Sequence, residues 1–268
     1  MSIIYEPTGK AREYSPLAAN LYSGCGHKCK YCYVPNVIKL EKKIFDNQTT
    51  ERNSIIENLR KDAKKLKGTN KQVLMSFTTD PYNPFNNIAK LTRKALEIFL
   101  ENQIPVAILT KGGMRAIQDL DVIKKFGEHI KIGASLIYDN DIDSKRVESG
   151  AALPNERLEM LKVFFKNHIK TWVSFEPIIQ PKQTLNLLKQ CLEYVDEFQF
   201  GKLADDKRSF DWNNFVNTII NILRNKNKEF YIKETLRKAA YKVQLQPKEI
   251  DVDYLTLKPF EQIKETLF

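Results

Sequence analysis

The sequence predicts an α/β fold in a single domain, built around a parallel sheet. Three observations support this prediction. Apolar runs of strand length alternate with segments whose apolar residues recur at helical spacing, which is typical of βα units. A chain of 268 residues with 42% hydrophobic content is long enough to build one large core. Polar or charged residues follow nearly every apolar run, at the strand ends where parallel folds place their sites.

The alternation gives six βα units between residues 17 and 225. The strands are expected at residues 17–22, 72–77, 105–109, 130–137, 170–175 and 197–201. The helices are expected at residues 51–66, 88–100, 115–126, 155–166, 183–195 and 211–224. Residues 1–16 are predicted to be an irregular lead-in, with breakers at Pro7, Gly9 and Pro16. Residues 226–268 are predicted to be a basic extension that packs on the barrel of strands, with a polar helix at 233–241 and a short helix at the end.

Composition and charge narrow the class of protein. Lys and Arg outnumber Asp and Glu by 43 to 33, and the net charge of +10 is compatible with a polyanionic partner. A lysine-rich solvated surface explains the same charge equally well. No signal peptide is recognisable at the start, and no apolar run approaches the roughly 20 residues that a bilayer requires. We therefore expect a cytoplasmic protein without a membrane partner.

Three cysteines fall within eight residues of the stretch NLYSGCGHKCKYCY at residues 20–33. Cys25, Cys29 and Cys32 have the spacing C-x3-C-x2-C, and the glycines on either side of Cys25 allow sharp turns. An iron–sulfur cubane usually takes four thiolates, so three leave one iron open for a substrate or cofactor. Alternatives are a structural zinc site completed by His27 or Cys191, redox thiols without metal and, least of all, disulfides.

This spacing resembles the radical S-adenosylmethionine superfamily, whose cluster loop reads C-x3-C-x-aromatic-C, with Tyr31 as the aromatic residue. Within it, the chain is similar to the spore photoproduct lyase-like group, which is related to DNA repair photolyases. The resemblance implies that the six units, at residues 17–225, form an open partial (βα)6 barrel. The matching pieces follow in order: GCxHxCxYCY at 24–33, TDPY at 79–82, LTR at 91–93, LTK at 109–111, SL at 135–136, ExGA at 148–151, RLE at 157–159 and SFEPI at 174–178.

The resemblance implies two cofactors and a set of site residues. Cys25, Cys29 and Cys32 would ligate a [4Fe-4S] cluster whose open iron binds S-adenosyl-L-methionine. The reduced cluster would cleave this cofactor to a 5'-deoxyadenosyl radical that abstracts hydrogen from a substrate. Cofactor contacts are expected from Tyr31, Thr78, Thr79, Asp80, Lys111, Ser135 and Glu176. Asp80 would meet the methionine ammonium and Lys111 its carboxylate. Catalytic roles are expected for Lys111 and for Tyr33, which could relay a hydrogen atom.

One departure from the lyase pattern affects the reaction. The spore lyases carry a hydrogen-donating cysteine three residues before the position of Asp80, and this chain has Phe77 there. Cys191 falls on or beside the apolar stripe of a predicted helix and is expected to act as a small hydrophobe. Repair of thymine dimers by a thiol relay is therefore not expected. His27 could tune the cluster or be exposed, and Arg157 could pair with Glu148 or Glu159.

The expected partners are a reductant such as flavodoxin or ferredoxin and a nucleic acid substrate, DNA before RNA. The nucleic acid would lie along a basic face of the extension, with aromatic residues as stacking platforms. The face would be formed by Lys226, Lys228, Lys233, Arg237, Lys238, Lys242 and Lys248, with Phe230, Tyr231 and Tyr241. The alternatives are a radical enzyme acting on a peptide or small metabolite, and a nucleic-acid-binding protein with a structural metal site.

Overall fold

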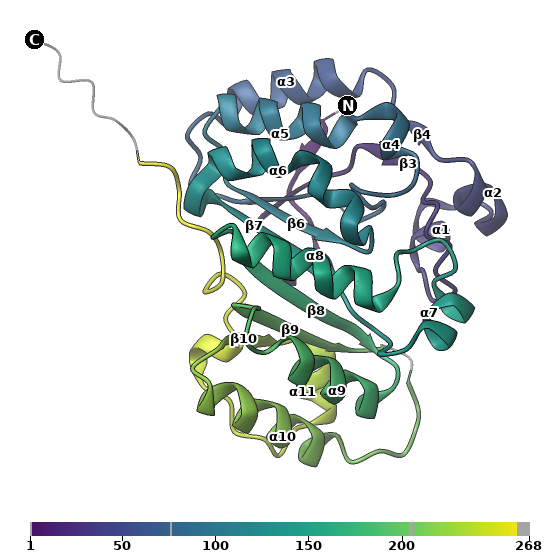
Figure 1. The fold of residues 1–268 in the computed structure, drawn as a ribbon, viewed down its shortest axis with the longest axis vertical. Coiled ribbons are helices and arrows are strands. Elements are labelled where there is room, and N and C mark those ends of the chain that lie inside the picture. Colours follow the sequence, from purple (N-terminus) through teal and green to yellow (C-terminus); the bar gives the residue numbers. More distant parts are fainter. Residues whose placement is uncertain (1, 76, 204–205, 262–268) are drawn as a thin grey trace, which may run out of the picture.

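The computed structural model describes residues 2–75, 77–203 and 206–261 of the chain. These residues fold around one eight-stranded sheet (Figure 1). The strand order is β1-β2-β5-β6-β7-β8-β9-β10, and every neighbouring pair is parallel except β1 and β2. The strands are β1 Ile4–Tyr5, β2 Leu17–Ala19, β5 Val73–Met75, β6 Val106–Thr110, β7 Ile130–Ser135, β8 Lys170–Ile178, β9 Glu197–Lys202 and β10 Glu229–Ile232. The predicted α/β class with a parallel sheet is confirmed.

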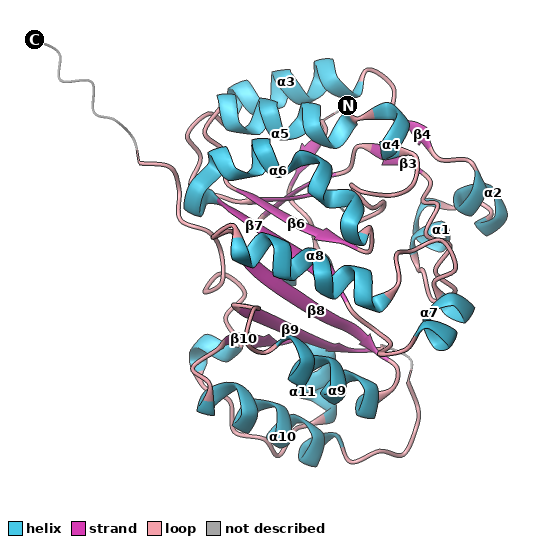
Figure 2. Cartoon of the chain, viewed as in Figure 1, coloured by secondary structure: helices cyan, strands magenta, loops and turns pink. Residues whose placement is uncertain are grey.

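Helices cover one face of the sheet (Figure 2). The α-helices are α1 Val34–Ile38, α2 Lys42–Asn47, α3 Ile55–Lys65, α4 Asn86–Ala89, α5 Leu91–Glu101, α6 Leu120–Ile123, α7 Asp141–Val147, α8 Pro154–Lys166, α9 Pro181–Cys191, α10 Trp212–Asn225 and α11 Glu234–Ala239. Short 3-10 turns occupy Gly9–Glu13, Gly113–Asp119, Lys124–His129 and Pro247–Glu249, and β3 Tyr22–Ser23 pairs with β4 Thr50–Glu51. None of the described helices is long and apolar enough to cross a membrane.

The two faces of the sheet hold separate apolar clusters, because side chains alternate along each strand. Val73 and Met75 join the large core under the helices, whereas Leu74 between them points to the other face. There Leu74 packs with Ala107 and Trp172 in a small inner cluster, which Tyr14, Phe77 and Leu109 extend. Cys191 is fully buried in the large core, as expected for a small hydrophobe. The inner face therefore leads from this small apolar layer to the carboxyl edge of the strands.

Three expectations differ from the structure. The predicted lead-in contains β1, which pairs with β2 because buried Ile3 and Ile4 anchor it. The helix expected at 115–126 is a 3-10 turn, the short α6 and a second 3-10 turn. The six expected parallel strands are seven in the described structure, since β10 pairs parallel to β9 although it lies in the predicted extension. Only four residues long and flanked by lysines, β10 gives a weak strand signal.

The rest of the extension crosses the amino-terminal end of the sheet. Lys131, near the start of β7, donates to the carbonyl oxygen of Leu255 at 2.7 Å and pairs with Glu197 at 2.7 Å. The N–H of Leu257 donates to Oε1 of Gln72 at 3.0 Å, and both leucines are buried. This segment covers the end of the sheet opposite to the predicted site. The short helix expected at the chain end lies among residues 262–268, outside the described part.

Candidate active site at the carboxyl edge of the sheet

The cysteine loop is fixed between α2 and the segment that follows α7. The N–H of Cys25 donates to the carbonyl oxygen of Phe45 at 2.9 Å, and the N–H of Gly150 donates to that of His27 at 3.0 Å. A side chain at Gly150 would place its Cβ 1.9 Å from the carbonyl oxygen of Gly26, so only glycine allows this approach. The loop conformation therefore depends on residues more than a hundred positions away in the chain.

The three cysteines of the loop are free and partly buried. Burial raises the pKa of Cys29 to about 11, so its thiol is neutral until a metal displaces the proton. In the described residues no three His, Cys, Asp or Glu side chains converge on one point as ligands of a single ion. The thiolates of a cubane bind separate irons, so they need not converge on one ion. The donor set of three thiols on a short loop thus fits an iron–sulfur cluster.

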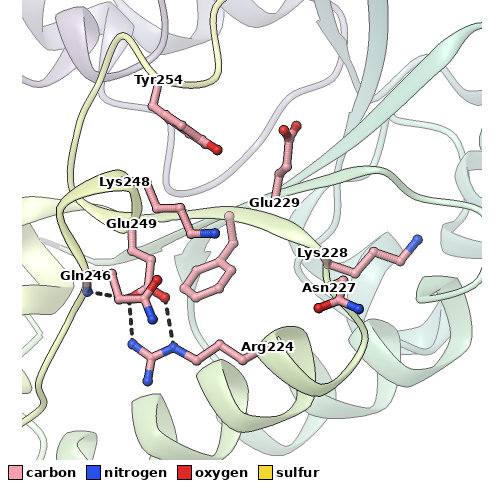
Figure 3. Close-up of a pocket in the computed structure, with 9 residues that line it drawn as sticks. Arg224, Asn227, Lys228, Glu229, Gln246, Lys248, Glu249 and Tyr254 are labelled. Carbon is pink, nitrogen blue, oxygen red and sulfur yellow. Dashed lines mark hydrogen bonds and ion pairs between the residues drawn. The ribbon is translucent and has the colours of Figure 1, made fainter.

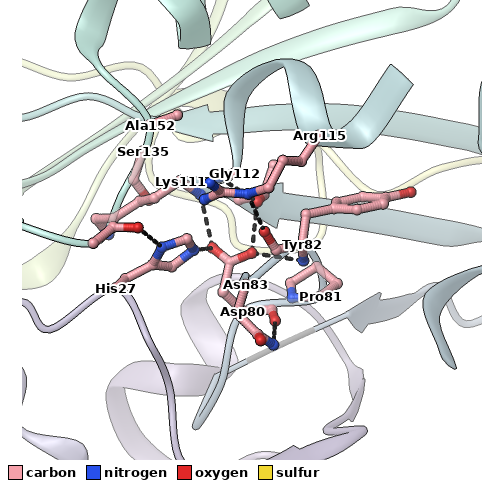
Figure 4. Close-up of polar contacts among 12 residues, drawn as sticks. His27, Asp80, Pro81, Tyr82, Asn83, Lys111, Gly112, Arg115, Ser135 and Ala152 are labelled. Carbon is pink, nitrogen blue, oxygen red and sulfur yellow. Dashed lines mark hydrogen bonds and ion pairs between the residues drawn. The ribbon is translucent and has the colours of Figure 1, made fainter. Parts of the chain in front are cut away.

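Asp80 is the centre of a hydrogen-bond network behind the loop (Figure 4). Its Oδ1 accepts from the N–H of Tyr82 at 2.8 Å and from the hydroxyl of Thr110 at 2.6 Å. Its Oδ2 accepts from the N–H of Lys111 at 2.7 Å and lies 3.1 Å from Nε2 of His27. Burial favours the neutral acid, but His27 and these hydrogen bonds outweigh it and hold the pKa of Asp80 well below its usual range.

These contacts change the interpretation of Asp80 and His27. The carboxylate of Asp80 was expected to meet the ammonium of S-adenosylmethionine, yet protein groups surround both of its oxygens. His27 is buried, and its Nδ1 lies 3.2 Å from the carbonyl oxygen of Gly150, so of the two alternatives for His27 the exposed ring is excluded. Together Asp80 and His27 connect the cysteine loop to the ends of β5 and β6.

A second buried network connects the loop to α8. The hydroxyl of Tyr31 donates to Oε1 of Glu148, and Arg157 donates to Oε2 of the same carboxylate at 2.7 Å. Arg157 also donates to the carbonyl oxygens of Ala152 and Ser135, at 2.8 and 2.9 Å. Of the two partners considered for Arg157, the structure thus selects Glu148. Tyr31 is held in one orientation, with its ring beside Lys111.

Several predicted cofactor residues lie at the ends of β5 and β6, next to these networks. Nζ of Lys111 lies 5.7 Å from the centroid of the Tyr31 ring and 3.9 Å from Oε1 of Glu148. Oγ1 of Thr79 is buried and has no hydrogen-bond partner within the described residues. The N–H of Thr78 is held by Oδ1 of Asn20 at 2.8 Å. An unpartnered buried hydroxyl and a lysine that stands 3.9 Å from its carboxylate partner are what a site for a polar ligand provides.

A third cluster lies farther along the same edge, at the ends of β8 and β10. Oε2 of Glu176 accepts from the hydroxyl of Tyr14 and pairs with Nζ of Lys233 at 2.7 Å. Ser174 lies 3.0 Å from the Tyr14 hydroxyl and is paired in register with Ser135 of β7. Lys233 is 1% exposed, so it belongs to the interior and not to the basic face expected for it. The strand ends thus bring Ser135 and Glu176 to one edge, as predicted.

One predicted residue, Tyr33, lies outside the core, and two residues of the networks, Asn20 and Tyr14, were not predicted. Tyr33 follows the last cysteine and is 57% exposed, so its side chain is not part of the core. Sequence reasoning missed Asn20, whose Oδ1 also accepts from the N–H of Phe77, and it missed Tyr14. Asn20 could have been found as a polar residue at the end of an apolar run. Tyr14 gave no signal, because it lies in a segment predicted to be irregular.

A surface cavity of about 280 Å³ lies at the other end of the sheet, between α10, β10 and the extension (Figure 3). Arg224 on its wall makes a two-pronged contact with Glu249, at 2.8 and 2.7 Å. Lys228 donates to the carbonyl oxygen of Val195 at 2.7 Å. Arg224 and Lys228 are thus already partnered. None of the predicted cluster or cofactor residues lines the cavity, whereas Lys228, Phe230 and Lys248 of the predicted basic face do. Its position does not support a catalytic role.

Comparisons with known proteins agree with the geometry. The Radical SAM superfamily matches residues 19–195. The uncharacterized protein MJ0683 of Methanocaldococcus jannaschii is 30% identical over 162 residues, which are 60% of this chain and 59% of that protein. The uncharacterized protein ORF301 of Acidianus two-tailed virus is 28% identical over 188 residues, or 66% and 61%. The chain thus spans about three fifths of the length of these curated relatives.

Solved structures share the fold at low sequence identity. Streptococcus suis SuiB bound to S-adenosylmethionine has a TM-score of 0.62 at 15% identity, with 85% of this chain and 53% of that chain covered. A tyrosine-to-phenylalanine mutant of spore photoproduct lyase has a TM-score of 0.62 at 14% identity, with 81% and 76% covered. The family match covers the cysteine loop and the whole of β5, β6, β7 and β8. The chain belongs to the Radical SAM superfamily.

Proposed function

We propose that the enzyme holds a [4Fe-4S] cluster on Cys25, Cys29 and Cys32 and uses S-adenosyl-L-methionine to abstract hydrogen from a substrate. When bound, the cluster supplies the electron that cleaves S-adenosylmethionine to methionine and a 5'-deoxyadenosyl radical. The observation that carries the proposal is the loop of three free, partly buried thiols, whose Tyr31 lies beside the ammonium of Lys111 at the end of β6.

The chain's own residues suit a zwitterionic cofactor. Lys111 supplies the cation for the methionine carboxylate, and the hydroxyl of Thr79 can accept from its ammonium. The ring of Tyr31 offers a flat surface for the adenine, held by its bond to Glu148. We assign Asp80 to positioning: it orients His27 and the backbone of Lys111 and does not contact the ammonium. Ser135 and Glu176 would lie on the substrate side of the bound S-adenosylmethionine.

Anaerobic reconstitution tests this proposal. The wild-type protein is expected to be brown, to contain about four irons and to release 5'-deoxyadenosine when dithionite and S-adenosylmethionine are added. Replacement of Cys29 by Ala should remove most of the iron and the product. Replacement of Cys191 by Ala, far from the loop in the core, should leave both in place. A colourless zinc protein that forms no 5'-deoxyadenosine would refute the proposal.

We propose a nucleic acid as the substrate, DNA before RNA, and a cytoplasmic setting with a protein reductant. Support comes from the net charge of +10 and from exposed lysines of the extension: Lys226, Lys238, Lys242 and Lys248. A structural neighbour, spore photoproduct lyase, has been crystallised with a dinucleoside spore photoproduct. Two of the expected stacking platforms, Phe230 and Tyr231, are buried, which leaves Tyr241 with 74% exposure. A peptide is the alternative, since the neighbour SuiB has been crystallised with its precursor peptide SuiA.

Oligonucleotide binding at two salt concentrations distinguishes these substrates. A nucleic acid bound by exposed lysines predicts that affinity falls steeply with salt. The Lys242→Ala/Lys248→Ala variant should bind more weakly and with a shallower salt dependence than wild type. The matched control is Lys64→Ala/Lys65→Ala, which removes two exposed lysines from α3. No binding of random single- or double-stranded oligonucleotides at low salt would favour the peptide.

A further inference from the structure

The outer side of the cysteine loop is an exposed basic surface. Lys28 and Lys30, which flank Cys29, are both exposed, while Cys29 between them is partly buried. Lys28 adopts a left-handed conformation with φ of 56°, which turns the chain between the first two cysteines. Cys29, a predicted cluster ligand, is therefore flanked in the chain by two exposed lysines. The inner side of the loop is taken up by the contacts of Tyr31 and Lys111.

Helix α2 contacts the cysteine loop through two hydrogen bonds. Nζ of Lys28 donates to Oδ1 of Asn47 at 2.7 Å, and Nζ of Lys42 donates to the carbonyl oxygen of Cys29 at 3.0 Å. The neighbouring helix face exposes Ile44 and Lys43. We call the set Lys28, Lys30, Lys43 and Ile44 the cluster-loop surface. A shallow hollow beside it is lined by Glu41, Lys43, Ile44, Asn47 and Gln48.

The cluster-loop surface combines an exposed apolar residue with positive charges, as a protein interface for a negatively charged partner would. Ile44 is an exposed apolar residue, and α1 next to it exposes Val37 and Ile38. The only exposed acidic residue between positions 28 and 48 is Glu41, since Asp46 is partly buried and paired with Lys42 at 2.9 Å. An apolar centre with a charged rim is typical of transient protein contacts, and the charge selects partners of opposite sign.

We propose that the cluster-loop surface docks an acidic electron-carrier protein and that the electron enters the cluster beside Cys29. This inference rests on the proposed function, which requires one electron for each cleavage. The electron passes from the reduced carrier to the oxidised cluster, so the carrier is oxidised and the cluster reduced. The surface suits this role because backbone and side-chain contacts of Lys28 and Lys42 lead directly to the ligand loop.

The experiment compares a protein reductant with a small one. Reconstituted wild type and the Lys28→Glu/Lys43→Glu and Ile44→Asp variants are reduced with flavodoxin hydroquinone or with dithionite, and 5'-deoxyadenosine is measured. We expect the flavodoxin-driven rate at limiting carrier to fall at least about tenfold in the variants, because electrostatic steering is reversed or the contact is broken. The dithionite-driven rate and the iron content should equal those of wild type. The Lys64→Glu/Lys65→Glu variant on α3 is the matched control and should keep both rates.

The outcomes separate the proposals. If dithionite yields no 5'-deoxyadenosine in wild type, the proposed function fails and the docking proposal fails with it. If dithionite works and the flavodoxin rate is unchanged in both variants, only the docking site is refuted. If the variants keep the flavodoxin rate but lose binding to oligonucleotides, the surface belongs to a nucleic acid and the proposal is likewise overturned.

Discussion

Arg157 places its guanidinium 2.7 Å from the carboxylate of Glu148, and both side chains are only 1% exposed. The pair joins α8 to the segment that pins the cysteine loop, because Cys29 forms an isolated bridge with Glu148. Arg157→Ala would leave the buried carboxylate of Glu148 without its closest cation. We expect it to lower the free energy of unfolding by about 3–5 kcal/mol, measured by urea denaturation of the unreconstituted protein. Lys162→Ala, which removes an exposed partner of Glu159 on the same helix, should change it by less than about 1 kcal/mol.

The ionisation of Glu148 should also make the stability of the folded protein depend on pH. Burial opposes its ionisation, but Arg157, Lys111 and the Tyr31 hydroxyl outweigh burial and lower the pKa of Glu148 below its usual range. A carboxyl group whose pKa is lower in the folded state than in the unfolded state stabilises the folded protein. This contribution is complete at pH values above the unfolded pKa of about 4.3. That contribution is lost as the pH falls through the folded pKa. Thermal unfolding between pH 7 and 3 should show a steeper decline for wild type than for Glu148→Gln, and an equal slope would contradict this assignment.

Thr79 and Thr110 offer a matched pair of hydroxyls. Oγ1 of Thr79 has no protein partner in the described residues, whereas that of Thr110 donates to Asp80 at 2.6 Å. Thr79→Val should leave the free energy of unfolding nearly unchanged and weaken S-adenosylmethionine binding about tenfold, because a hydrogen bond to a charged ligand is lost. Thr110→Val should lower the free energy of unfolding by about 1–3 kcal/mol. Calorimetric titration with denaturation curves measures both, and a normal affinity in Thr79→Val would remove this residue from the site.

The sequence predicted the parts of the molecule whose signals are local. Buried strands such as β7 are largely apolar runs, and polar residues at the ends of parallel strands share one edge of the sheet, which is where Ser135 and Glu176 lie. The cysteine spacing identified the loop by itself. The superfamily could therefore be predicted from the amino-acid sequence alone.

The sequence could not predict which side chains pair across the site. Tyr14 contacts Glu176 from 162 residues away, and no periodicity records such a pairing. Nothing local in the sequence showed that the end of β6 and His27 would contact both carboxylate oxygens of Asp80. β10 was missed because four residues between charged flanks are too few for an alternation to stand out.

Of two lysines predicted to contact nucleic acid, Lys233 is buried and Lys248 is exposed. Lys233 was expected to contact phosphates, but it is 1% exposed and paired with Glu176, so Lys233→Met should lower the free energy of unfolding by about 3–5 kcal/mol. Lys248 is exposed, and Lys248→Met should change stability by no more than about 0.5 kcal/mol. If nucleic acid binds along the extension, Lys248→Met should reduce the slope of log affinity against log salt by about one, and Lys233→Met should leave it unchanged. Denaturation curves and oligonucleotide titrations at two salt concentrations provide both measurements. A stable Lys233→Met variant with a reduced slope would show that Lys233 faces the nucleic acid and that the Glu176 pairing is not maintained in solution.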